Sequence, residues 1–292
     1  MDDIDRAWLR LAHLATAANP TLAQRVIANG PQAVLDACFT DPKWGERLAA
    51  LDLDTELERA ERLGVRVITR GSASWPSQLA QLGPREPFAL WLNGVADVRL
   101  TALQSIAIVG ARDATRYGLD LTHRLASDLA LKDWNTVSGG AFGIDAAAHR
   151  GALAVERPTV CVVAGGVDVV YPAAHHALFE SIKNCGVIVS ESPLGTSIRR
   201  EAFLPRNRII AALSRATVVV ESAVRSGSLN TAREARDLNR VVCAVPGSVH
   251  SAQSVGCHHL IRDQYANLVC NADDVLEYLG GPIRDRPATM LL

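Results

Sequence analysis

The sequence predicts an α/β protein: a Rossmann-like, mostly parallel sheet with helices on both faces, preceded by a small all-helical domain. Two observations predict this class. From residue 65 onward, short apolar runs without polar alternation are separated by stretches with helical spacing, which is typical of parallel strands buried on both faces. The residues before 64 show helical spacing without such runs. We therefore expect a helical, SAM-like domain at 1–63, a Rossmann-like domain at 64–280 and a flexible tail at 281–292.

The N-terminal segment is expected to form a small group of helices. Its clearest apolar stripe repeats at intervals of three and four residues, at Ile4, Trp8, Leu11 and Ala15. Gly64 follows the last expected helix and suits the left-handed conformation that often ends one. Residues 1–60 contain ten acidic and six basic residues, and we find no catalytic pattern among them.

Strands and helices are expected to alternate in the rest of the chain. The expected strands are 65–69, 88–94, 105–110, 136–140, 159–166, 187–192, 217–222, 241–247 and 266–269. After the third strand, the first expected helix contains Tyr117, Leu121, Leu125 and Leu129 at i, i+4 spacing. The later helices are expected at 144–155, 174–184, 206–214, 229–239, 257–263 and 272–279. A loop with a short helix is expected between the first two strands.

The composition is that of a packed protein with almost no net charge. It is 48% hydrophobic and 21% charged, with a net charge of −1, so any site for a polyanion must be local. The six cysteines form no C-x-x-C pair, which indicates a reduced, cytoplasmic protein rather than a disulfide framework. No apolar run approaches the roughly 18 residues of a membrane span, and the acidic N-terminus has no secretion signal.

Glycine-rich turns are expected at the carboxyl ends of four strands. These turns contain Gly110, the loop 138–143, Gly165-Gly166 and Ser226-Gly227-Ser228. In a parallel sheet such turns meet at one edge, where helix N-termini offer free N–H groups to an anion. Glycine at such turns is also common for tight packing alone, but four converging loops favour an anion pocket.

No common nucleotide or metal motif is present. The chain contains no G-x-x-x-x-G-K-[ST] and no G-x-G-x-x-G, and its two adjacent histidine pairs are not spaced to share a metal on a helix. Asp145 and His149 stand four residues apart; a dyad is conceivable, but an acid at the helix N-terminus with a packed histidine is the better interpretation. We expect no cofactor and no metal.

Positive charge is concentrated in one segment. Residues 199–240 contain nine arginines and four acids. Arg206 and Arg208 lie at the start of an expected helix, where a cation opposes the helix dipole, so a compensating anion is expected. Phe203 and Phe142 could stack on nucleic-acid bases, although a core contact is about as plausible for each ring.

Seven linked motifs resemble, in order and spacing, those of the DNA-processing protein A (DprA, also called Smf) family. They are SIAIVGARDATRYG, VSGGAFGIDAAAHRGAL, VVAGGVDVVYP, FLPRNRIIAALS, SGSLNTAREA, VPGSV and GCHHLIRDQYANLV. The resemblance covers roughly residues 65–280. It implies a protein that binds single-stranded DNA rather than cutting it, protects incoming DNA, forms a homodimer and helps load RecA recombinase during natural transformation.

The resemblance and the expected anion pocket together give a set of candidate residues. The predicted DNA-binding residues are Gly110, Arg112, Gly139, Gly140, Phe142, Gly143, Phe203, Arg206, Asn207, Arg208, Ser226, Gly227, Ser228 and Thr231. Segment 256–263 resembles the part of the family used for self-association and recombinase contact, so we predict His258, Ile261 and Leu268 at the dimer or partner surface.

Two features depart from the family pattern. Many relatives read S-G-L-A-R-G-I-D in the second glycine loop, where this chain has Gly140 and Phe142 in place of Leu and Arg. One cation is thereby exchanged for a ring. Many relatives also carry a C-terminal winged helix, which we do not expect in this chain.

Two other functions remain open at the sequence level. Nucleoside-monophosphate phosphoribohydrolases share the general fold and use P-G-G-x-G-T-x-x-E, of which Gly227, Thr231 and Glu234 are present here. Glu234 could be a remnant of that catalytic acid or a surface residue paired with a neighbouring arginine, and we prefer the second explanation. A carrier of a small anionic ligand could use the same pocket.

Overall fold

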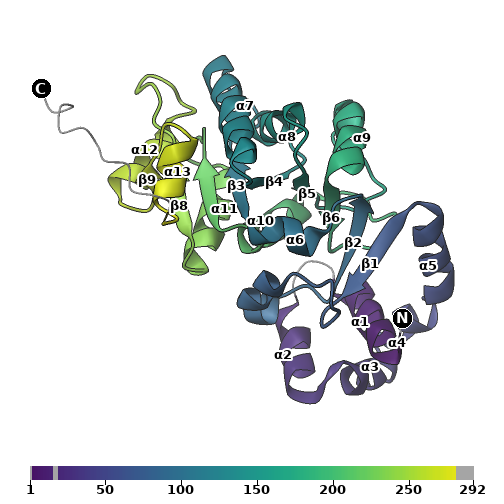
Figure 1. Cartoon of the computed structure of the whole chain (residues 1–292). Helices are drawn as coiled ribbons and strands as arrows, with labels where there is room; N and C mark the ends of the chain where they lie inside the picture. The colour runs from purple at the N-terminus through teal and green to yellow at the C-terminus, as the bar shows by residue number, and fades with distance from the viewer. Residues whose placement is uncertain (1, 16–18, 281–292) are drawn as a thin grey trace, which may run out of the picture.

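Nine strands form one sheet that carries most of the chain. The computed structural model describes residues 2–15 and 19–280; the tail predicted at 281–292 lies outside the described residues. Figure 1 shows the sheet running through the middle of the molecule, with helices on both faces and the N-terminal helices gathered at one end. The predicted α/β class with a mostly parallel sheet is confirmed.

The strand order places the middle of the sequence at the centre of the sheet. The order is β1-β2-β6-β5-β4-β3-β7-β8-β9. The strands are β1 (Val65–Thr69), β2 (Ala89–Gly94), β3 (Ser105–Val109), β4 (Asn135–Gly139), β5 (Thr159–Val162), β6 (Val187–Ser190), β7 (Ala216–Val219), β8 (Val241–Ala244) and β9 (Asn267–Leu268). All pairs from β6 to β9 are parallel, whereas β2 is antiparallel to both β1 and β6.

Helices cover both faces because the strands are apolar on both sides. Ile106 and Ile108 of β3 pack into one cluster, and Ala107 and Val109 of the same strand pack into the opposite one. The helices are α6 (Val98–Leu103), α7 (Arg116–Leu131), α8 (Ile144–Ala154), α9 (His176–Cys185), α10 (Phe203–Leu213), α11 (Gly227–Asp237), α12 (Val255–Arg262) and α13 (Ala272–Glu277). Three 3₁₀ helices, η1 (Ser77–Arg85), η2 (Ala173–His175) and η3 (Arg200–Ala202), complete this part.

The N-terminal helices form as predicted, and Trp8, Leu11 and Ala15 of the predicted stripe pack into the core. They are α1 (Asp3–Leu14), α2 (Pro20–Asn29), α3 (Pro31–Phe39), α4 (Gly45–Ala49) and α5 (Leu53–Arg62). In α1 the buried residues are Ala7, Leu9, Leu11, Ala12 and Leu14, whereas Ile4 is 57% exposed. The predicted stripe was therefore wrong at Ile4. Gly64 has a φ of 65° and ends α5 as expected.

The N-terminal helices share a core with the edge of the sheet. Leu9 and Leu11 belong to the same buried cluster as Phe88 and Trp91 beside and within β2. The rings of Trp8 and Phe88 lie 5.5 Å apart between their centroids. A boundary near residue 63 stays a prediction, but the contacts join the two parts through apolar packing.

The order of strands changes side at β3, although the strands stay parallel, and this positions the site. β4, β5 and β6 follow β3 on one side, and β7, β8 and β9 lie on the other. Consequently α7 packs on one face of the sheet while α11 packs on the other. The loops that leave neighbouring strands β3 and β7 lead to helices on opposite faces. Where two loops part in this way, a doubly wound sheet has a crevice at the carboxyl ends of its strands. No described helix is both long and apolar enough to cross a bilayer.

Candidate nucleic-acid interface

A broad cleft lies at this crevice. Its walls are the loops after β3, β4 and β7, the N-terminus of α11, and the segment that leads into α10. Its volume is about 1460 Å³, which exceeds the roughly 300–1,000 Å³ of typical small-ligand pockets. Five arginines line it: Arg112, Arg200, Arg206, Arg225 and Arg233. The acids in the lining are Asp113, Asp145 and Glu201.

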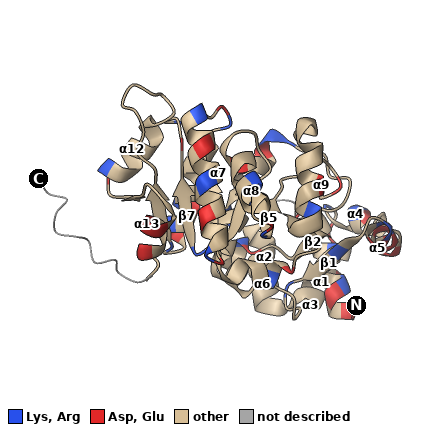
Figure 2. Ribbon diagram, turned by 45° about the horizontal axis from the view of Figure 1, so that its top comes forward, with Lys and Arg blue, Asp and Glu red and all other residues tan. Residues whose placement is uncertain are grey.

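The cleft lining carries more basic than acidic side chains, five arginines against three acids. Figure 2 shows basic and acidic residues interspersed along α7, on one face of the sheet. With a net charge of −1, the molecule as a whole does not attract a polyanion. The cleft is therefore a local basic surface of the kind that a polyanion site in a nearly neutral protein requires.

Arg112 stands on a loop that is fixed from both sides. The N–H of Ala111 donates to the carbonyl oxygen of Glu221 at 2.7 Å, and the Glu221 carboxylate accepts from the N–H and hydroxyl of Thr115 at 2.8 and 2.6 Å. The exposed Arg112 guanidinium lies 4.8 Å from the centre of the Phe203 ring. It has no ion pair with a carboxylate of the described chain. A fixed backbone and an uncompensated cation suit phosphate binding.

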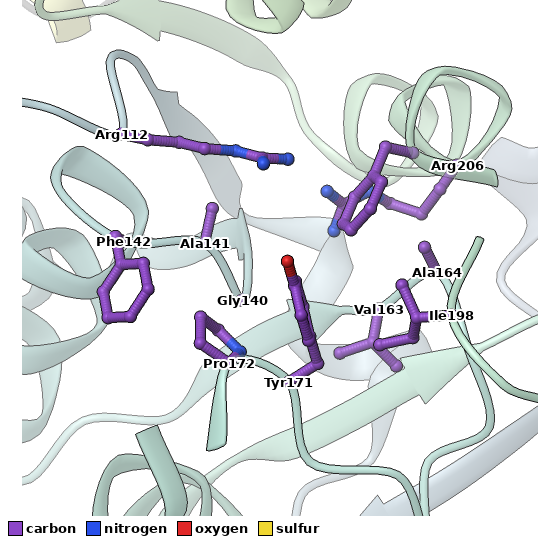
Figure 3. Close-up of a pocket in the computed structure, with 11 residues that line it drawn as sticks. Arg112, Gly140, Ala141, Phe142, Val163, Ala164, Tyr171, Pro172, Ile198 and Arg206 are labelled. Atoms are coloured by element: carbon purple, nitrogen blue, oxygen red, sulfur yellow. The ribbon is translucent and has the colours of Figure 1, made fainter. Parts of the chain in front are cut away.

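Arg206 faces Arg112 from the opposite wall. Figure 3 shows the two side chains extending toward each other, with the hydroxyl of Tyr171 pointing between them. Arg206 is only 6% exposed, and its Nη1 donates to the carbonyl oxygen of Val162 at the end of β5. Its Nε has no hydrogen-bond partner among the described residues. A buried, charged donor without an acceptor is rare in proteins, and Arg206 also lines the cleft.

Burial and neighbouring charges act on Arg206 together. Burial lowers the pKa of Arg206, the nearby Asp145 carboxylate opposes this, and Arg112 adds to the lowering. Burial likewise raises the pKa of Asp145, against the effects of Arg206 and Arg112. Arginine remains charged under such shifts. Two guanidinium groups thus repel each other across the cleft, and a phosphate between them would relieve that repulsion.

Three rings stand beside the two arginines. Phe142 and Tyr171 are about half exposed, and Phe203 is partly buried. The Tyr171 and Phe203 rings lie 5.9 Å apart, and Phe142 contacts the ring of His175 at 4.6 Å. All three line a small pocket with Arg112 and Arg206. Exposed rings next to cations are the pattern that binds unpaired bases.

The N-terminus of α11 forms the far wall of the cleft. Ser226 caps this helix, and its hydroxyl bonds to that of Ser228 at 2.8 Å. Asn207 of α10 donates to the carbonyl oxygen of Gly227 at 3.1 Å. Nothing lies nearer than 4.0 Å to a side chain placed at Gly227, so this glycine keeps the wall open. Thr231 lines the cleft but is buried.

The glycines predicted to cradle an anion serve mainly for packing. A Cβ at Gly110 would lie 2.5 Å from Ile144, and one at Gly140 would lie 2.7 Å from Phe179. At Gly139 it would lie 2.6 Å from the Arg206 guanidinium, so this glycine makes room for the cation itself. Gly143 has a φ of 74° and lies against the carbonyl oxygens of the Arg112 loop.

Arg208 is not brought to the cleft. Its side chain is 1% exposed and forms two hydrogen bonds with the carboxylate of Glu191, at 2.7 and 2.6 Å. Its Nε donates to the carbonyl oxygen of Arg85 at 2.7 Å. Arg206 and Arg208 are two residues apart on a helix and therefore point in opposite directions. The predicted phosphate contact of Arg208 stays without support from the geometry.

Four cleft residues were missed at the sequence level. Arg200, Arg225 and Arg233 line the cleft, and Tyr171 stands between its two central arginines. The three arginines belong to the basic segment 199–240, but charge density alone does not say which cations share a surface. Arg225 had the clearest signal, because it directly precedes the Ser226-Gly227-Ser228 turn.

The predicted partner residues lie away from the cleft, near the edge strand β9. Leu268 of β9 is 47% exposed. Ile261 of α12 is partly buried, and His258 Nε2 lies 3.1 Å from the carbonyl oxygen of Gly247. Among the described strands, β9 pairs with β8 alone, and an edge of this kind can pair with another strand.

The Asp145–His149 pair is not arranged for proton transfer to a substrate. His149 is fully buried, with Nε2 2.8 Å from the carbonyl oxygen of Gly139 and Nδ1 2.7 Å from the Thr159 hydroxyl. The Nε2–H donates to the carbonyl, and Nδ1 accepts from the hydroxyl. Both ring nitrogens are therefore occupied, Nε2 by the backbone of β4 and Nδ1 by a side chain of β5.

His149 is expected to make stability depend on pH. Burial lowers its pKa from 6.5 to about 4, so the unfolded chain gains this proton first as pH falls. Its neutral form supports the fold fully above about pH 6.5, and stability should fall by about 1.4 kcal/mol per pH unit below that value toward pH 4. Urea unfolding at pH 5, 6 and 7 should show a shallower decline in His149→Gln than in wild type. If the free energy of unfolding declined equally in both proteins, the His149 ring would not be buried as a neutral donor.

The fold and the cleft define a class of protein: a doubly wound α/β protein with an arginine- and ring-lined cleft at its topological switch point. The model of the DNA recombination-mediator protein A family matches residues 66–280, and the chain belongs to that family. A Mycobacterium tuberculosis protein that carries the name DNA processing protein DprA is 42% identical to this chain. That alignment covers 96% of this chain and 76% of the relative.

Solved structures of the same family agree with this assignment. DprA of Streptococcus pneumoniae superposes with a TM-score of 0.80 at 30% identity, covering 93% of this chain and 97% of that one. DNA processing protein A of Helicobacter pylori, described for its single-stranded DNA binding mode, gives a TM-score of 0.66 at 27% identity, over 74% and 95% of the two chains. The predicted family and fold are confirmed.

Proposed function

We propose that this protein binds single-stranded DNA in the cleft, where Arg112 and Arg206 hold backbone phosphates and neighbouring rings stack on bases. One observation carries the proposal: the two arginines come from different elements, β3–α7 and α10, yet face each other in one cleft. Hydrogen bonds from guanidinium groups to phosphate are among the strongest in proteins. The binding mode described for the Helicobacter pylori relative supports the same ligand.

The rings favour a single strand over a duplex. Phe142, Tyr171 and Phe203 can stack only on bases that are unpaired. Backbone contacts and stacking distinguish poorly between bases, so binding should tolerate most sequences. A competition of single- against double-stranded oligonucleotides of equal length tests this: the single strand should win at both low and moderate salt. Equal competition by the duplex would exclude the stacking mode.

An enzymatic function of the phosphoribohydrolase type is not favoured. Glu234, the acid that such an enzyme would require, receives two hydrogen bonds from Arg85 Nη1, at 3.0 and 2.7 Å. It does not belong to the cleft lining. We therefore propose a binding protein rather than an enzyme, and incubation with AMP should release no adenine. A small anionic ligand is also a poor match for so large a cleft.

We further propose a homodimer formed through β9 and α12. Among the described strands β9 is the last of the sheet, and its exposed Leu268 and unpaired backbone groups offer a surface for a second copy. Leu268→Asp should convert the dimer to a monomer in light scattering, while the exposed Leu131→Asp, on α7, should not. A wild-type monomer at tens of micromolar would exclude this interface.

The proposed cellular role is the protection of incoming single strands and the loading of RecA recombinase onto them. The family description as a recombination mediator supports this role. The protein should accelerate RecA filament formation on strands coated with single-strand-binding protein. No acceleration by a preparation that binds DNA would separate DNA binding from recombinase loading.

A further inference from the structure

We propose that Arg59 of the N-terminal helices positions one wall of the DNA cleft without touching DNA. This inference rests on the proposed function and extends it to residues outside the match of the family model, which begins at residue 66. The wall is the segment 193–204, which we call the wall segment. It connects β6 to α10 and contributes Ile198, Arg200, Phe203 and Leu204 to the cleft lining.

The wall segment is attached to the rest of the protein near its first residues. The N–H of Gly195 donates to both carboxylate oxygens of Asp168, at 2.8 and 3.0 Å. The N–H of Leu194 donates to the carboxylate of Glu56 in α5, at 3.3 Å. The N–H of Gly166 donates to the carbonyl oxygen of Thr196 at 3.0 Å. Within the described chain, residues 197–201 make no hydrogen bond outside the wall segment.

Arg59 holds this attachment together. Its Nη2 lies 2.7 Å from Oδ2 of Asp168, the same carboxylate that receives the Gly195 N–H. Asp168 is largely buried, with a side chain 13% exposed, and a charge in such a place needs a partner. Gly195 has a φ of 73°, and its Cβ position would lie 3.2 Å from the Arg59 guanidinium. Arg59 therefore packs directly on the turn that begins the wall.

The position of the wall decides where its cleft residues stand. Ile198 packs on Gly165, with 2.6 Å between its Cγ1 and the Cβ position of that glycine. Phe203, further along, is the ring over which Arg112 lies. Arg59 itself does not line the cleft. A shift of the Gly195 turn would thus move the wall segment, with its ring and its cation, relative to Arg112.

Hydrogen exchange of the free protein tests the attachment without any DNA. Arg59→Ala should speed exchange in peptides covering 193–202 and leave α7 peptides unchanged. Arg59→Lys, which keeps the charge, should restore much of the protection. Arg62→Ala, on the same helix and exposed, is the matched control and should exchange as wild type does. Unchanged exchange in Arg59→Ala overturns the inference, whether or not the protein binds DNA.

Binding measurements then test the consequence for DNA. Arg59→Ala should weaken single-strand binding by roughly three- to tenfold, with the same salt dependence as wild type because no phosphate contact is lost. The loss should be much smaller when Phe203→Ala is already present, since the ring that the wall positions is gone. A lower salt slope would mean that Arg59 contacts phosphate directly, and unaltered affinity would mean that the wall position is irrelevant; either overturns the inference. Failure of wild type to bind single strands would instead reject the proposed function.

Discussion

Replacing Arg112 and Arg206 together is expected to weaken single-stranded DNA binding by about 100-fold or more. Hydrogen bonds to charged groups contribute about 1.5–3 kcal/mol each, and each tenfold change in affinity corresponds to about 1.4 kcal/mol. We suggest Arg112→Ala with Arg206→Met, because methionine fills the buried space of Arg206. Burial raises the pKa of Asp145, and removing the two arginines that oppose this effect would raise it further. Fluorescence anisotropy with a labelled oligothymidylate measures the loss.

A matched control separates this effect from a general loss of charge. Arg116 lies four residues after Arg112, is highly exposed, and pairs with Asp120 rather than lining the cleft. Arg116→Ala should bind within about twofold of wild type, because an isolated surface pair contributes little. If the control and the double variant lost affinity equally, binding would reflect diffuse charge and not the cleft.

Arg208→Met is expected to destabilise the fold strongly while leaving the DNA cleft intact. Removing one partner of a buried ion pair costs about 3–5 kcal/mol, and here Glu191 would be left without its bidentate partner. The carbonyl oxygens of Arg85 and Pro205 would also lose their donor. Urea unfolding at pH 7 should show the loss as a lower midpoint.

The double variant Arg208→Met, Glu191→Met distinguishes a structural pair from a DNA contact. Removing both charges should recover much of the stability, because the unpaired buried carboxylate is gone. This variant should also bind single strands nearly as wild type does. A stable Arg208→Met protein with a lower salt slope would instead support the phosphate contact that the sequence suggested.

The fold could be predicted because its signal is repeated along the chain. Each strand of the parallel part is a short apolar run, as in Ser105–Val109, and each is followed by a helical stretch. Features with only a weak local sequence signal were not predicted. The six-residue helix α6 was missed, since so short a segment shows little periodicity, although Asp97 caps it. The exposure of Ile4 was missed because helical spacing does not show where along a helix the packing begins, which in α1 is at Ala7.

The site was only partly predictable, because the sequence gives the charge of a side chain but not the direction in which it points. The glycine turns lie at the edge of the sheet where the cleft is found, yet Gly110 and Gly140 have their space filled by packing. Arg206 and Arg208 carry the same charge in the same motif, and only the structure shows that one faces Arg112 while the other faces Glu191. Tyr171 gave no signal, because an aromatic residue in a loop has no period to reveal its neighbours.

The salt dependence of binding by the Arg112→Ala, Arg206→Met variant tests the central claim most directly. Each phosphate neutralised on a single strand contributes about 0.7 to the slope of log affinity against log salt concentration. If both guanidinium groups hold phosphates, the slope of the double variant should be smaller than that of wild type by about 1.4. An identical slope in the two proteins would contradict the claim that these facing arginines grip the DNA backbone.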